Sequence, residues 1–392
     1  MIETFNERLA EVASYFNHGD YHLGYRRLLD AAIETNDFTV YEKTLAFCDW
    51  YDNHGGQERD KAVINEKVKD LLSVIGQGYR TPAAGQYEVK LSAESVSKKY
   101  SRGSFSLSSV DVALRPSEII GLVGENGNGK TTFLRLLYGE LQPDTGIIKY
   151  HFKNNPASSS FYDIKTRIAF IPQRPAAWYG LLMDNLQFAS TYAGLKGKEN
   201  YLWTEMIIAR MGLRPFRSYT WSRISSGYKM RFELARTLIR KPEILLLDEP
   251  LANLDILAQQ IILEDLRFLA RSYSMPLSVI LSSQQLYEVE KVSDQVIFLQ
   301  KGIAKYQHTG EKEEAAPAPL IIELETSASR EQLQQVINPL GLEKLSFNGG
   351  VYILYFTGGT QMGSVLSAIG QGGLPVKYLR DISVSSRRFF DA

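Results

Sequence analysis

The sequence predicts an α/β core, an all-α segment before it and a small α+β domain after it. Short apolar runs alternate with helical patterns from about residue 88 to residue 310, which is typical of an α/β sheet. Before this core, apolar residues recur at helical spacing. After it, the pattern follows the order strand–helix–strand–strand–helix–strand. The expected domains are therefore 1–80, 88–310 and 320–392.

The composition limits the kinds of function that the chain can have. Its 392 residues carry 44 basic and 44 acidic side chains, so nothing indicates a strongly basic surface for nucleic acid. Cys48 is the only cysteine, which excludes a disulfide framework and a cysteine-based zinc site and fits a reducing compartment. The first residues do not resemble a signal peptide. Apolar runs such as Val351–Phe356 have the length of strands, so a role at a membrane would need another chain to span it.

Residues 1–80 are expected to form four helices in two hairpins. Phe5, Val12 and Phe16 lie on one helical face, and polar or glycine-containing breaks follow at 18–20, 35–37 and 53–56. Residues 20–32 faintly resemble a tetratricopeptide hairpin. Two weak units do not establish a repeat, so a plain amphipathic helical domain is the preferred interpretation. A segment with glycines and a proline at 76–86 is expected to be a linker.

Residues 320–392 are expected to form a ferredoxin-like domain after a charged linker rich in Ala and Pro at 311–319. The expected strands are Leu320–Leu324, Lys344–Phe347, Val351–Phe356 and Val376–Ile382, and the expected helices are Arg330–Ile337 and Met362–Ile369.

A phosphate-binding loop follows the apolar run Ile119–Val123, which is expected to be a buried strand. The loop ends in Lys-Thr-Thr, and 133–138 continues as a helix, so the pattern lies in the strand–loop–helix context of a P-loop. Glycines there let backbone N–H groups turn toward anionic oxygens at the positive end of a helix. Lys130 is expected to neutralise the β and γ phosphates, and the Thr131 hydroxyl is expected to ligate Mg²⁺. The residues of this cradle are Gly124, Glu125, Asn126, Gly127, Asn128, Gly129, Lys130, Thr131 and Thr132.

A pair of carboxylates follows a second buried strand. Asp248 and Glu249 come directly after Ile244–Leu247, at the strand end where α/β sheets bind their ligands. Asp248 is expected to hold the metal, directly or through water, and Glu249 to polarise the attacking water as a general base. A capped strand end without a ligand is the alternative, and the nearby P-loop disfavours it.

A second anion-binding turn lies about twenty residues before Asp248. Ser225, Ser226 and Gly227 offer hydroxyls and backbone N–H groups at the start of a helix. This segment, with the helix after it, resembles the signature sequence of the ABC (ATP-binding cassette) family. One nucleotide does not need two cradles in one chain. The resemblance therefore implies two chains packed head to tail, with the signature of one closing on the γ-phosphate held by the other.

Further landmarks of the ABC family appear in order, and the resemblance covers about 88–310. It implies that ATP and Mg²⁺ are the ligands, and that Gln173 reaches toward Mg²⁺ and couples a helical subdomain at about 175–235 to the core. It also implies that Asp255 bridges the dimer interface and that Tyr100 stacks on adenine. For Tyr100, packing at the end of a strand is the alternative, since stacking needs only an aromatic face.

Two positions depart from the common pattern of the family. The signature has Ser226 and Tyr228 where many relatives have glycine and glutamine, and this form is familiar among exporter-type members. At the position of the switch histidine the chain has Gln284, whose amide donates a hydrogen bond but does not titrate. With Glu249 in place, ATP is expected to bind normally and to be hydrolysed more slowly than with histidine. The alternative is that Gln284 has no kinetic effect.

In relatives the helical subdomain binds the membrane-spanning partner chain. Here Trp178, Tyr179 and Trp221 are expected to belong either to its core, which is preferred, or to a docking groove.

The resemblance implies the ATP-binding and ATP-hydrolysing subunit of an ABC transporter that energises a separate permease. It would act as a homodimer or heterodimer and lie in the cytoplasm, peripheral on the inner face of the cell membrane. The Ser-Ser-Gly signature, the C-terminal domain and a tail containing Arg387 and Arg388 favour an exporter, although these arginines could simply be solvated. One alternative is an ABC ATPase that acts on ribosomes or nucleic acid, and the single cassette and lack of zinc modules disfavour it. Another is a hydrolysis-impaired cassette that regulates by binding ATP.

Overall fold

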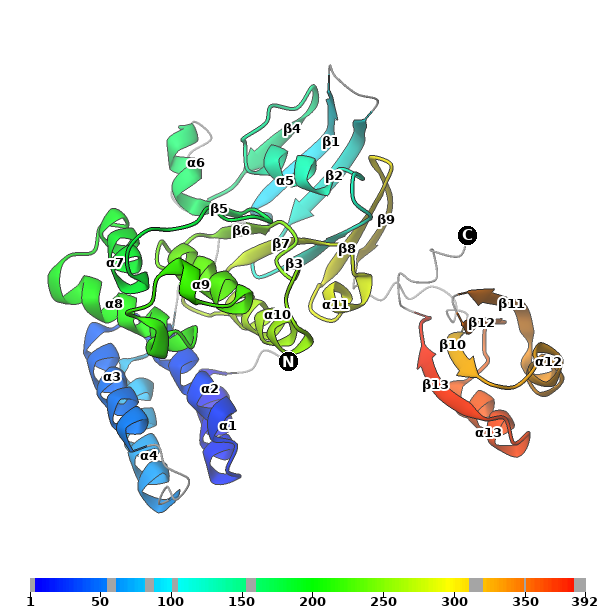
Figure 1. Cartoon of the computed structure of the whole chain (residues 1–392), viewed down its shortest axis with the longest axis horizontal. Coiled ribbons are helices and arrows are strands. Elements are labelled where there is room, and N and C mark those ends of the chain that lie inside the picture. The colour runs from blue at the N-terminus through cyan, green and yellow to red at the C-terminus, as the bar shows by residue number, and fades with distance from the viewer. Residues whose placement is uncertain are drawn as a thin grey trace. The chain divides into compact units, whose positions relative to one another are not determined.

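The computed structural model describes residues 4–54, 61–81, 88–100, 105–152, 160–309, 320–348 and 350–383. Its contacts divide the chain into two compact units. The first consists of Met1–Gln285 and Ile297–Lys305, and the second of Leu286–Val296 and Tyr306–Ala392. The predicted boundary near residue 80 falls inside the first unit, because the N-terminal helices pack on the helical subdomain of the core (Figure 1).

Four helices form the N-terminal part, as the sequence predicts: α1 (Phe5–Asn17), α2 (Tyr21–Glu34), α3 (Phe38–Asn53) and α4 (Lys61–Gly78). Thr4, Asp20 and Asp37 cap the first three helices by accepting backbone N–H groups, which explains why each helix begins where it does. The apolar stripe of α1 is buried through Val12 and Phe16. The helices contact one another through such faces, so tertiary packing stabilises elements that propensity alone would leave marginal.

The core contains a six-stranded sheet of order β5-β6-β7-β3-β8-β9. Its strands are β3 (Ile119–Val123), β5 (Ile168–Ile171), β6 (Ile244–Leu247), β7 (Ser278–Ser283), β8 (Gln295–Gln300) and β9 (Ile303–Thr309). The pairs β5–β6, β6–β7 and β7–β3 are parallel. All residues of β3 and β6 are buried, as the continuous apolar runs predict. The helices α5 (Lys130–Leu137) and α10 (Ile256–Ala270) both contact β7.

A separate antiparallel sheet lies beside this core and is absent from the sequence-based expectations. It contains β1 (Leu91–Lys99), β2 (Ser106–Leu114) and β4 (Thr145–Tyr150) in the order β2-β1-β4, and α6 (Phe161–Arg167) precedes β5 (Figure 1). Buried and exposed residues alternate in part of β2, because one face of this sheet is packed and the other is not. Leu91 and Val110 join the hydrophobic cluster of the main core with Phe133 of α5.

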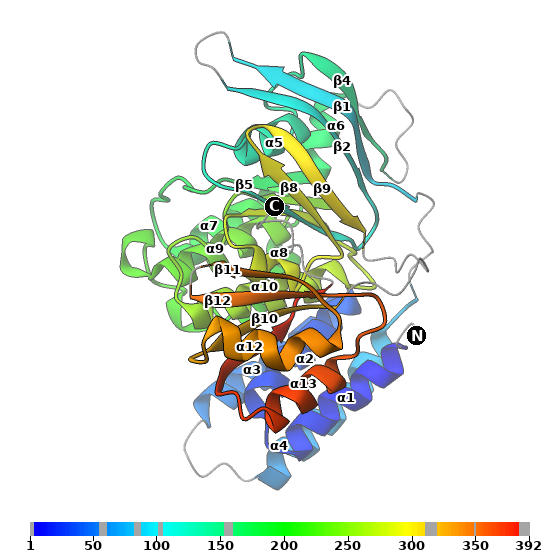
Figure 2. The same ribbon diagram turned by 90° about the vertical axis from the view of Figure 1, so that its right-hand side faces the viewer.

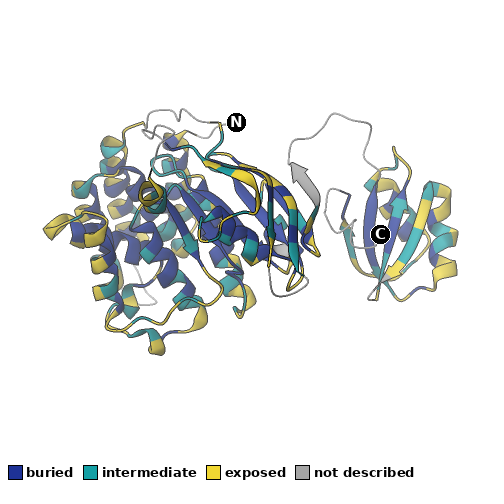
Figure 3. Cartoon of the chain, turned by 90° about the horizontal axis from the view of Figure 1, so that it is seen from above, coloured by how far each residue is buried: buried dark blue, intermediate teal, exposed yellow. Residues whose placement is uncertain are grey.

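The helical subdomain spans α7 (Leu182–Tyr192), α8 (Gly197–Arg210) and α9 (Ser226–Leu238), so α9 extends a little beyond the predicted range of about 175–235. Two 3-10 turns lie between α8 and α9: η1 (Arg214–Phe216) and η2 (Trp221–Arg223). In Figure 3 the buried residues of the first unit, drawn in dark blue, lie in its interior. Most of α8 is buried because α2 and α3 pack on it, as do α7 and α9. Trp203 at its centre donates a hydrogen bond from Nε1 to the carbonyl of Ile239 at 3.0 Å.

A buried ionic network connects the N-terminal helices to the core. The side chain of Arg210 is 1% exposed, and its guanidinium pairs with Asp30 of α2 and Asp265 of α10. Arg26 of α2 also pairs with Asp265. Burial by itself opposes ionisation of Asp265, but Arg210 and Arg26 hold the pKa of its carboxyl below the ordinary value. Nearby, Arg214 pairs with Asp49 of α3 at 2.5 Å between Nη2 and Oδ1.

The second unit contains the element order that the sequence predicts for the C-terminal domain. Its elements are β10 (Ile321–Thr326), α12 (Arg330–Ile337), η3 (Asn338–Leu340), β11 (Leu342–Asn348), β12 (Val351–Phe356), α13 (Met362–Gln371) and β13 (Val376–Asp381), together with α11 (Leu286–Glu290). The strands form an antiparallel sheet of order β11-β12-β10-β13. Leu333 of α12 and Val365 of α13 pack on the same face as Ile322 and Phe356, so both helices cover one side of the sheet (Figure 2). Arg387 and Arg388 lie outside the described residues.

Within the described residues, no helix combines the length and the apolar character needed to cross a bilayer.

Replacing Arg210 should destabilise the first unit strongly. Arg210→Ala removes the cation shared by the buried Asp265 and the half-buried Asp30, and we expect the free energy of unfolding to fall by about 3–5 kcal/mol. Lys198→Ala is the matched control, because Lys198 of α8 pairs with Glu42 of α3 across the same contact but in an exposed position. That variant should cost at most about 1 kcal/mol. Urea denaturation measures both, and equal losses would show that the buried network has no special role.

Candidate functional site

The loop that follows β3 is built to face an anion. Gly127 and Gly129 have φ angles of 82° and 101°, which lie in the left-handed region that other residues adopt only at a cost. Gly129 is the N-cap of α5, and no side chain makes a capping hydrogen bond there. The N-terminus of α5 therefore directs its partial positive charge and backbone N–H groups toward the loop.

Lys130 lies inside this loop and not on its surface. Its side chain is 4% exposed, and Nζ donates to the carbonyls of Gly124 and Glu125 at 2.6 and 3.1 Å. The third neighbour of Nζ is Oε1 of Glu249, at 3.1 Å. A buried ammonium with three oxygen partners is well solvated by the protein, and it stands where phosphate oxygens would enter the cradle.

Asp248 is the centre of a hydrogen-bonded group at the carboxyl end of the sheet. The Thr131 hydroxyl donates to Oδ2 of Asp248 at 2.8 Å, and the Ser282 hydroxyl donates to Oδ1 at 2.7 Å. β3, β6 and β7 run parallel, so their carboxyl ends bring the residues that follow them to one edge. The hydroxyl of Thr131 and the carboxylate of Asp248 are hard oxygen ligands of the type that Mg²⁺ prefers, and their contact fits a shared metal.

Ser282 is a site residue that the sequence analysis missed. Its hydroxyl accepts the backbone N–H of Glu249 at 2.9 Å while it donates to Asp248, so one side chain orients both members of the carboxylate pair. The available signal was a polar residue at the end of the apolar run Val279–Leu281.

Glu249 is held in a strained backbone conformation beside Gln284. Its φ of 48° lies in the left-handed region, which costs about 1 kcal/mol or more for a residue other than glycine. Nε2 of Gln284 donates to Oε2 of Glu249 at 2.8 Å, while Lys130 contacts the other carboxylate oxygen. Gln284 directly follows β7, so the register inferred from the sequence brings it next to the expected general base.

The remaining predicted residues of this edge are more peripheral. The Tyr100 hydroxyl lies 3.2 Å from that of Thr132, and its ring is partly exposed at the end of β1. Gln173 is exposed two residues after β5, and Glu125 is exposed in the loop. Asn128 accepts the backbone N–H of Lys301 at 3.0 Å, so its side chain anchors the loop to the turn after β8.

The predicted signature forms a second turn, which is tied to the segment around Asp255. Ser225 caps α9, and Asp255 caps α10 by accepting the N–H of Ala258 at 2.8 Å. The Ser226 hydroxyl donates to the carbonyl of Asn253 at 3.1 Å. Gly227 also lies close to Ala258, since a Cβ at Gly227 would stand 3.3 Å from the Ala258 side chain. The described residues show no hydrogen bond from this turn to the phosphate-binding loop.

The aromatic residues singled out in the helical subdomain do not form one cluster. Trp178 donates to Glu233 at 2.7 Å, and Trp221 packs edge-on against Phe232. Tyr179, in contrast, is 93% exposed. Two of the three therefore pack on α9, and the third faces solvent.

Comparison with known proteins gives consistent matches for this core. A family model described as ABC transporter matches residues 107–252. The ABC transporter ATP-binding protein NatA of Bacillus subtilis is 30% identical over 203 residues, which cover 50% of this chain and 79% of NatA. The zinc import ATP-binding protein ZnuC of Pseudomonas aeruginosa is 31% identical over 219 residues, which cover 56% of this chain and 73% of ZnuC.

A solved structure supports the same fold. The cbiO1 protein of Clostridium perfringens, described as part of the ABC transporter complex cbiONQ, matches with a TM-score of 0.52 and 23% identity, covering 58% of this chain and 93% of cbiO1. The match confirms the expected α/β core. The fold, the sequence relatives and the residues gathered at the strand ends together identify the family. This chain belongs to the ABC transporter ATP-binding protein family, and it is an ABC-type ATPase.

Proposed function

We propose that this chain is the ATP-hydrolysing subunit of an ABC exporter, that it works as a dimer, and that it drives a separate membrane-spanning chain. The observation that carries the catalytic part is the convergence of Lys130, Asp248 and Glu249 at one strand edge. The chain would then lie in the cytoplasm, attached to the inner face of the membrane through its permease.

Nucleotide binding follows from the loop and the residues around it. Lys130 would exchange its contacts with loop carbonyls for contacts with the β and γ phosphates, and the residues from Gly124 to Thr132 would surround them. Thr131 and Asp248 would hold Mg²⁺, with Gln173 reaching toward it. The ion would supply charge neutralisation at the phosphates. Tyr100 would stack on the adenine.

Glu249 would orient and polarise the attacking water. A carboxylate suits this role when its position is fixed, and here the strained backbone, Ser282 and Gln284 fix it. Gln284 would position the carboxylate and contact the γ-phosphate, but it cannot take up a proton as histidine can. Hydrolysis would therefore be slower than in relatives with histidine.

Two exposed apolar side chains next to Asp255 support the proposed dimer. Ile256 and Leu257, at the start of α10, are 73% and 66% exposed, although large apolar side chains usually find cover. They adjoin the signature turn through the Ser226–Asn253 hydrogen bond. A second cassette packed head to tail would cover them and bring Ser225–Gly227 to the nucleotide of the first chain.

A membrane partner is supported by a set of exposed aromatic residues on α6, α7 and the loop between them. Tyr162 of α6 and Tyr192 of α7 are both exposed. The set consists of Phe161, Tyr162, Tyr179, Phe188 and Tyr192. Exposed aromatic side chains of this kind suit a hydrophobic protein partner better than a nucleic acid, which would need basic residues.

Export is the direction that the resemblance of the Ser-Ser-Gly signature favours. We further classify the C-terminal unit as ferredoxin-like, since its two helices cover one face of a four-stranded antiparallel sheet. A domain of this kind attached to the cassette would stabilise or regulate the dimer.

Lys130→Ala should weaken ATP binding. Loss of a charge-assisted hydrogen bond to phosphate costs about 1.5–3 kcal/mol, which corresponds to roughly a 10- to 100-fold higher Kd. Calorimetric titration with ATP and Mg²⁺ measures the change. Lys149→Ala is the control, because Lys149 of β4 forms an exposed pair with Glu94 of β1. An unchanged Kd for Lys130→Ala would contradict the assigned phosphate cradle.

Gln284→His should raise the ATPase turnover. The imidazole titrates near neutral pH and can share a proton with the reacting groups, so we expect an increase of about tenfold or more. Steady-state phosphate release measures kcat. Gln285→His is the control, because it adds the same side chain one position further along, at another exposed residue. If both variants hydrolyse ATP at the native rate, Gln284 does not limit the reaction.

Glu249→Gln should trap the ATP-bound dimer. The amide keeps the shape of the side chain but loses the base, so ATP would bind without being hydrolysed. We expect size-exclusion chromatography to show a dimer only with ATP and Mg²⁺.

A multi-span membrane protein should co-purify with the tagged variant from a detergent extract of its native cells. Ribosomes or DNA in its place would support the alternative functions, and the absence of any trapped dimer would overturn the proposed mechanism.

A further inference from the structure

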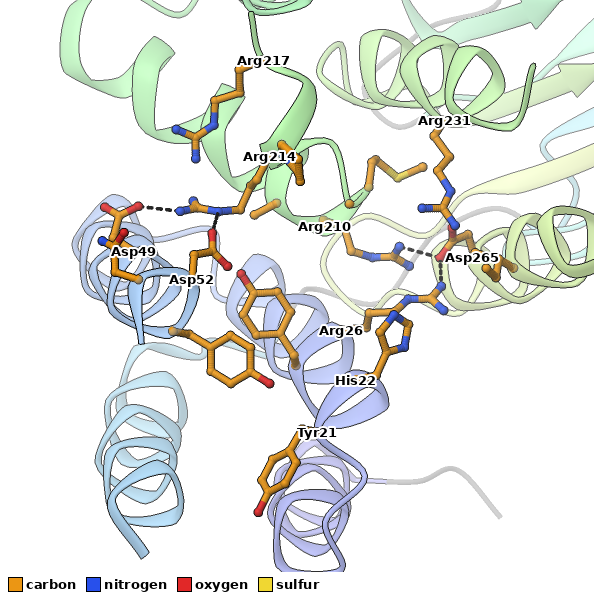
Figure 4. Close-up of a pocket in the computed structure, with 18 residues that line it drawn as sticks. Tyr21, His22, Arg26, Asp49, Asp52, Arg210, Arg214, Arg217, Arg231 and Asp265 are labelled. Carbon is orange, nitrogen blue, oxygen red and sulfur yellow. Dashed lines mark hydrogen bonds and ion pairs between the residues drawn. The ribbon is translucent and has the colours of Figure 1, made fainter. Parts of the chain in front are cut away.

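A cavity of about 940 Å³ lies between the N-terminal helices and the helical part of the ATPase core (Figure 4). Its walls come from α2 and α3 on one side and from α8, η1, α9 and α10 on the other. The volume is in the range of pockets that enclose small organic molecules. None of the residues assigned above to ATP or Mg²⁺ lines it, so it is separate from the nucleotide site.

The lining of the cavity contains more arginine than carboxylate side chains. Its arginines are Arg26, Arg210, Arg214, Arg217 and Arg231, and its carboxylates are Asp49, Asp52 and Asp265. Acids outside the lining neutralise part of this charge, since Asp30 pairs with Arg210, Glu264 with Arg26 and Glu205 with Arg217. The aspartates are already engaged, because Asp265 pairs with Arg26 and Arg210, while both aspartates of α3 pair with Arg214.

Arg231 is the cation of this lining that lacks an acidic partner. It extends from α9 toward the cavity beside Asp265 (Figure 4), yet in the described part of the chain no carboxylate lies within ion-pair distance of it. Burial lowers the pKa of its guanidinium, the charge of Asp265 opposes this effect, and the neighbouring Arg26 and Arg210 lower the pKa further. A partly buried arginine among other arginines is unfavourable unless an anion joins it.

Two N–H groups on other arginines of this lining make no hydrogen bond in the described part of the chain, and both atoms are buried. They are Nη2 of Arg210 and Nε of Arg217. Arg210 is almost fully buried, and Nε of Arg217 lies 3.4 Å from a carboxylate oxygen of Glu205 without a hydrogen bond to it. Buried N–H groups of charged side chains are costly to leave unpaired.

The cavity also offers an apolar surface for the body of a ligand. The rings of Tyr25 and Tyr51 stack with their centroids 4.9 Å apart, and Met211, Pro215 and Ile261 contribute further apolar atoms. A bare inorganic ion would use only the arginines, whereas an organic anion would use both kinds of surface.

We propose that this cavity binds a small organic anion whose carboxylate or phosphate group pairs with Arg231 and whose aromatic or apolar body lies on the tyrosine side. The planar fork of arginine matches carboxylate and phosphate equally well. The ligand bridges α2 and α3 to α9, the helix that begins at the signature turn. The N-terminal helices thereby give the cassette a second small-molecule site.

The experiment is a calorimetric titration of the full chain with two aromatic anions, phthalate and phenyl phosphate. The nucleotide site is first saturated with ADP and Mg²⁺, so that neither probe can enter the phosphate cradle. We expect at least one probe to bind with a stoichiometry of one per chain, and the stronger probe shows whether the site prefers a carboxylate or a phosphate. The neutral benzamide should not bind. If neither anion binds, or if benzamide binds as tightly, the proposal is wrong.

Variants locate the binding. Arg231→Ala should raise the Kd of the bound anion by about tenfold or more. Arg231→Lys keeps the charge but loses the fork, so its Kd should lie between those of the native and alanine proteins. Arg271→Ala, at the exposed end of α10, should leave the Kd unchanged. Because Arg231 forms no ion pair with the described residues, both variants should melt at the native temperature or above. A native Kd in both Arg231 variants would overturn the proposal.

Discussion

The site depends on one geometric constraint, which is that three parallel strands end at the same edge of a sheet. β3, β6 and β7 are neighbours in register, so the residues after them arrive within hydrogen-bonding distance although they come from distant parts of the sequence. Thr131 and Asp248 are separated by 117 positions, and their side chains are 2.8 Å apart. The sheet must be buried on both faces to hold this register, which accounts for the continuous apolar runs in β3 and β6.

Around this edge, each charged group is fixed by more than one neighbour. Lys130 contacts two carbonyls and a carboxylate, and Glu249 contacts both Lys130 and Gln284. The backbone strain at Glu249 persists because Ser282 holds its N–H while holding Asp248 as well. Oriented polar groups of this kind need little rearrangement during a reaction, and this is the main way in which a protein stabilises developing charge.

The sequence predicts these features to different degrees, and the difference follows from the range of each signal. Neighbouring residues determine where the helices begin, at Thr4, Asp20 and Asp37, and where two strands end, before Gly124 and Asp248. Signals of this short range can be recognised in the sequence. The separate sheet of β1, β2 and β4 could not, because an alternating strand does not reveal its partner. Nor could the role of Ser282 be inferred, since it depends on which strands lie side by side. The arginine-lined cavity likewise exists only once α2 and α3 are placed on α8.

The ion pairs of Arg210 constrain which substitutions the chain can accept during evolution. Asp30 and Arg210 are 180 positions apart, in segments that the sequence alone predicts to be two domains. The buried guanidinium of Arg210 nevertheless binds Asp30 in the N-terminal helices and Asp265 in the core. A change of Arg210 to an uncharged residue would leave Asp30 with Arg27 and Asp265 with Arg26 as their remaining cations. The extension and the cassette are therefore expected to be inherited together, with substitutions at positions 30, 210 and 265 tied to one another. A family member that lacks the helices would lose Asp30 and Arg26 together, and an arginine at the position of Arg210 would then serve the α10 aspartate alone.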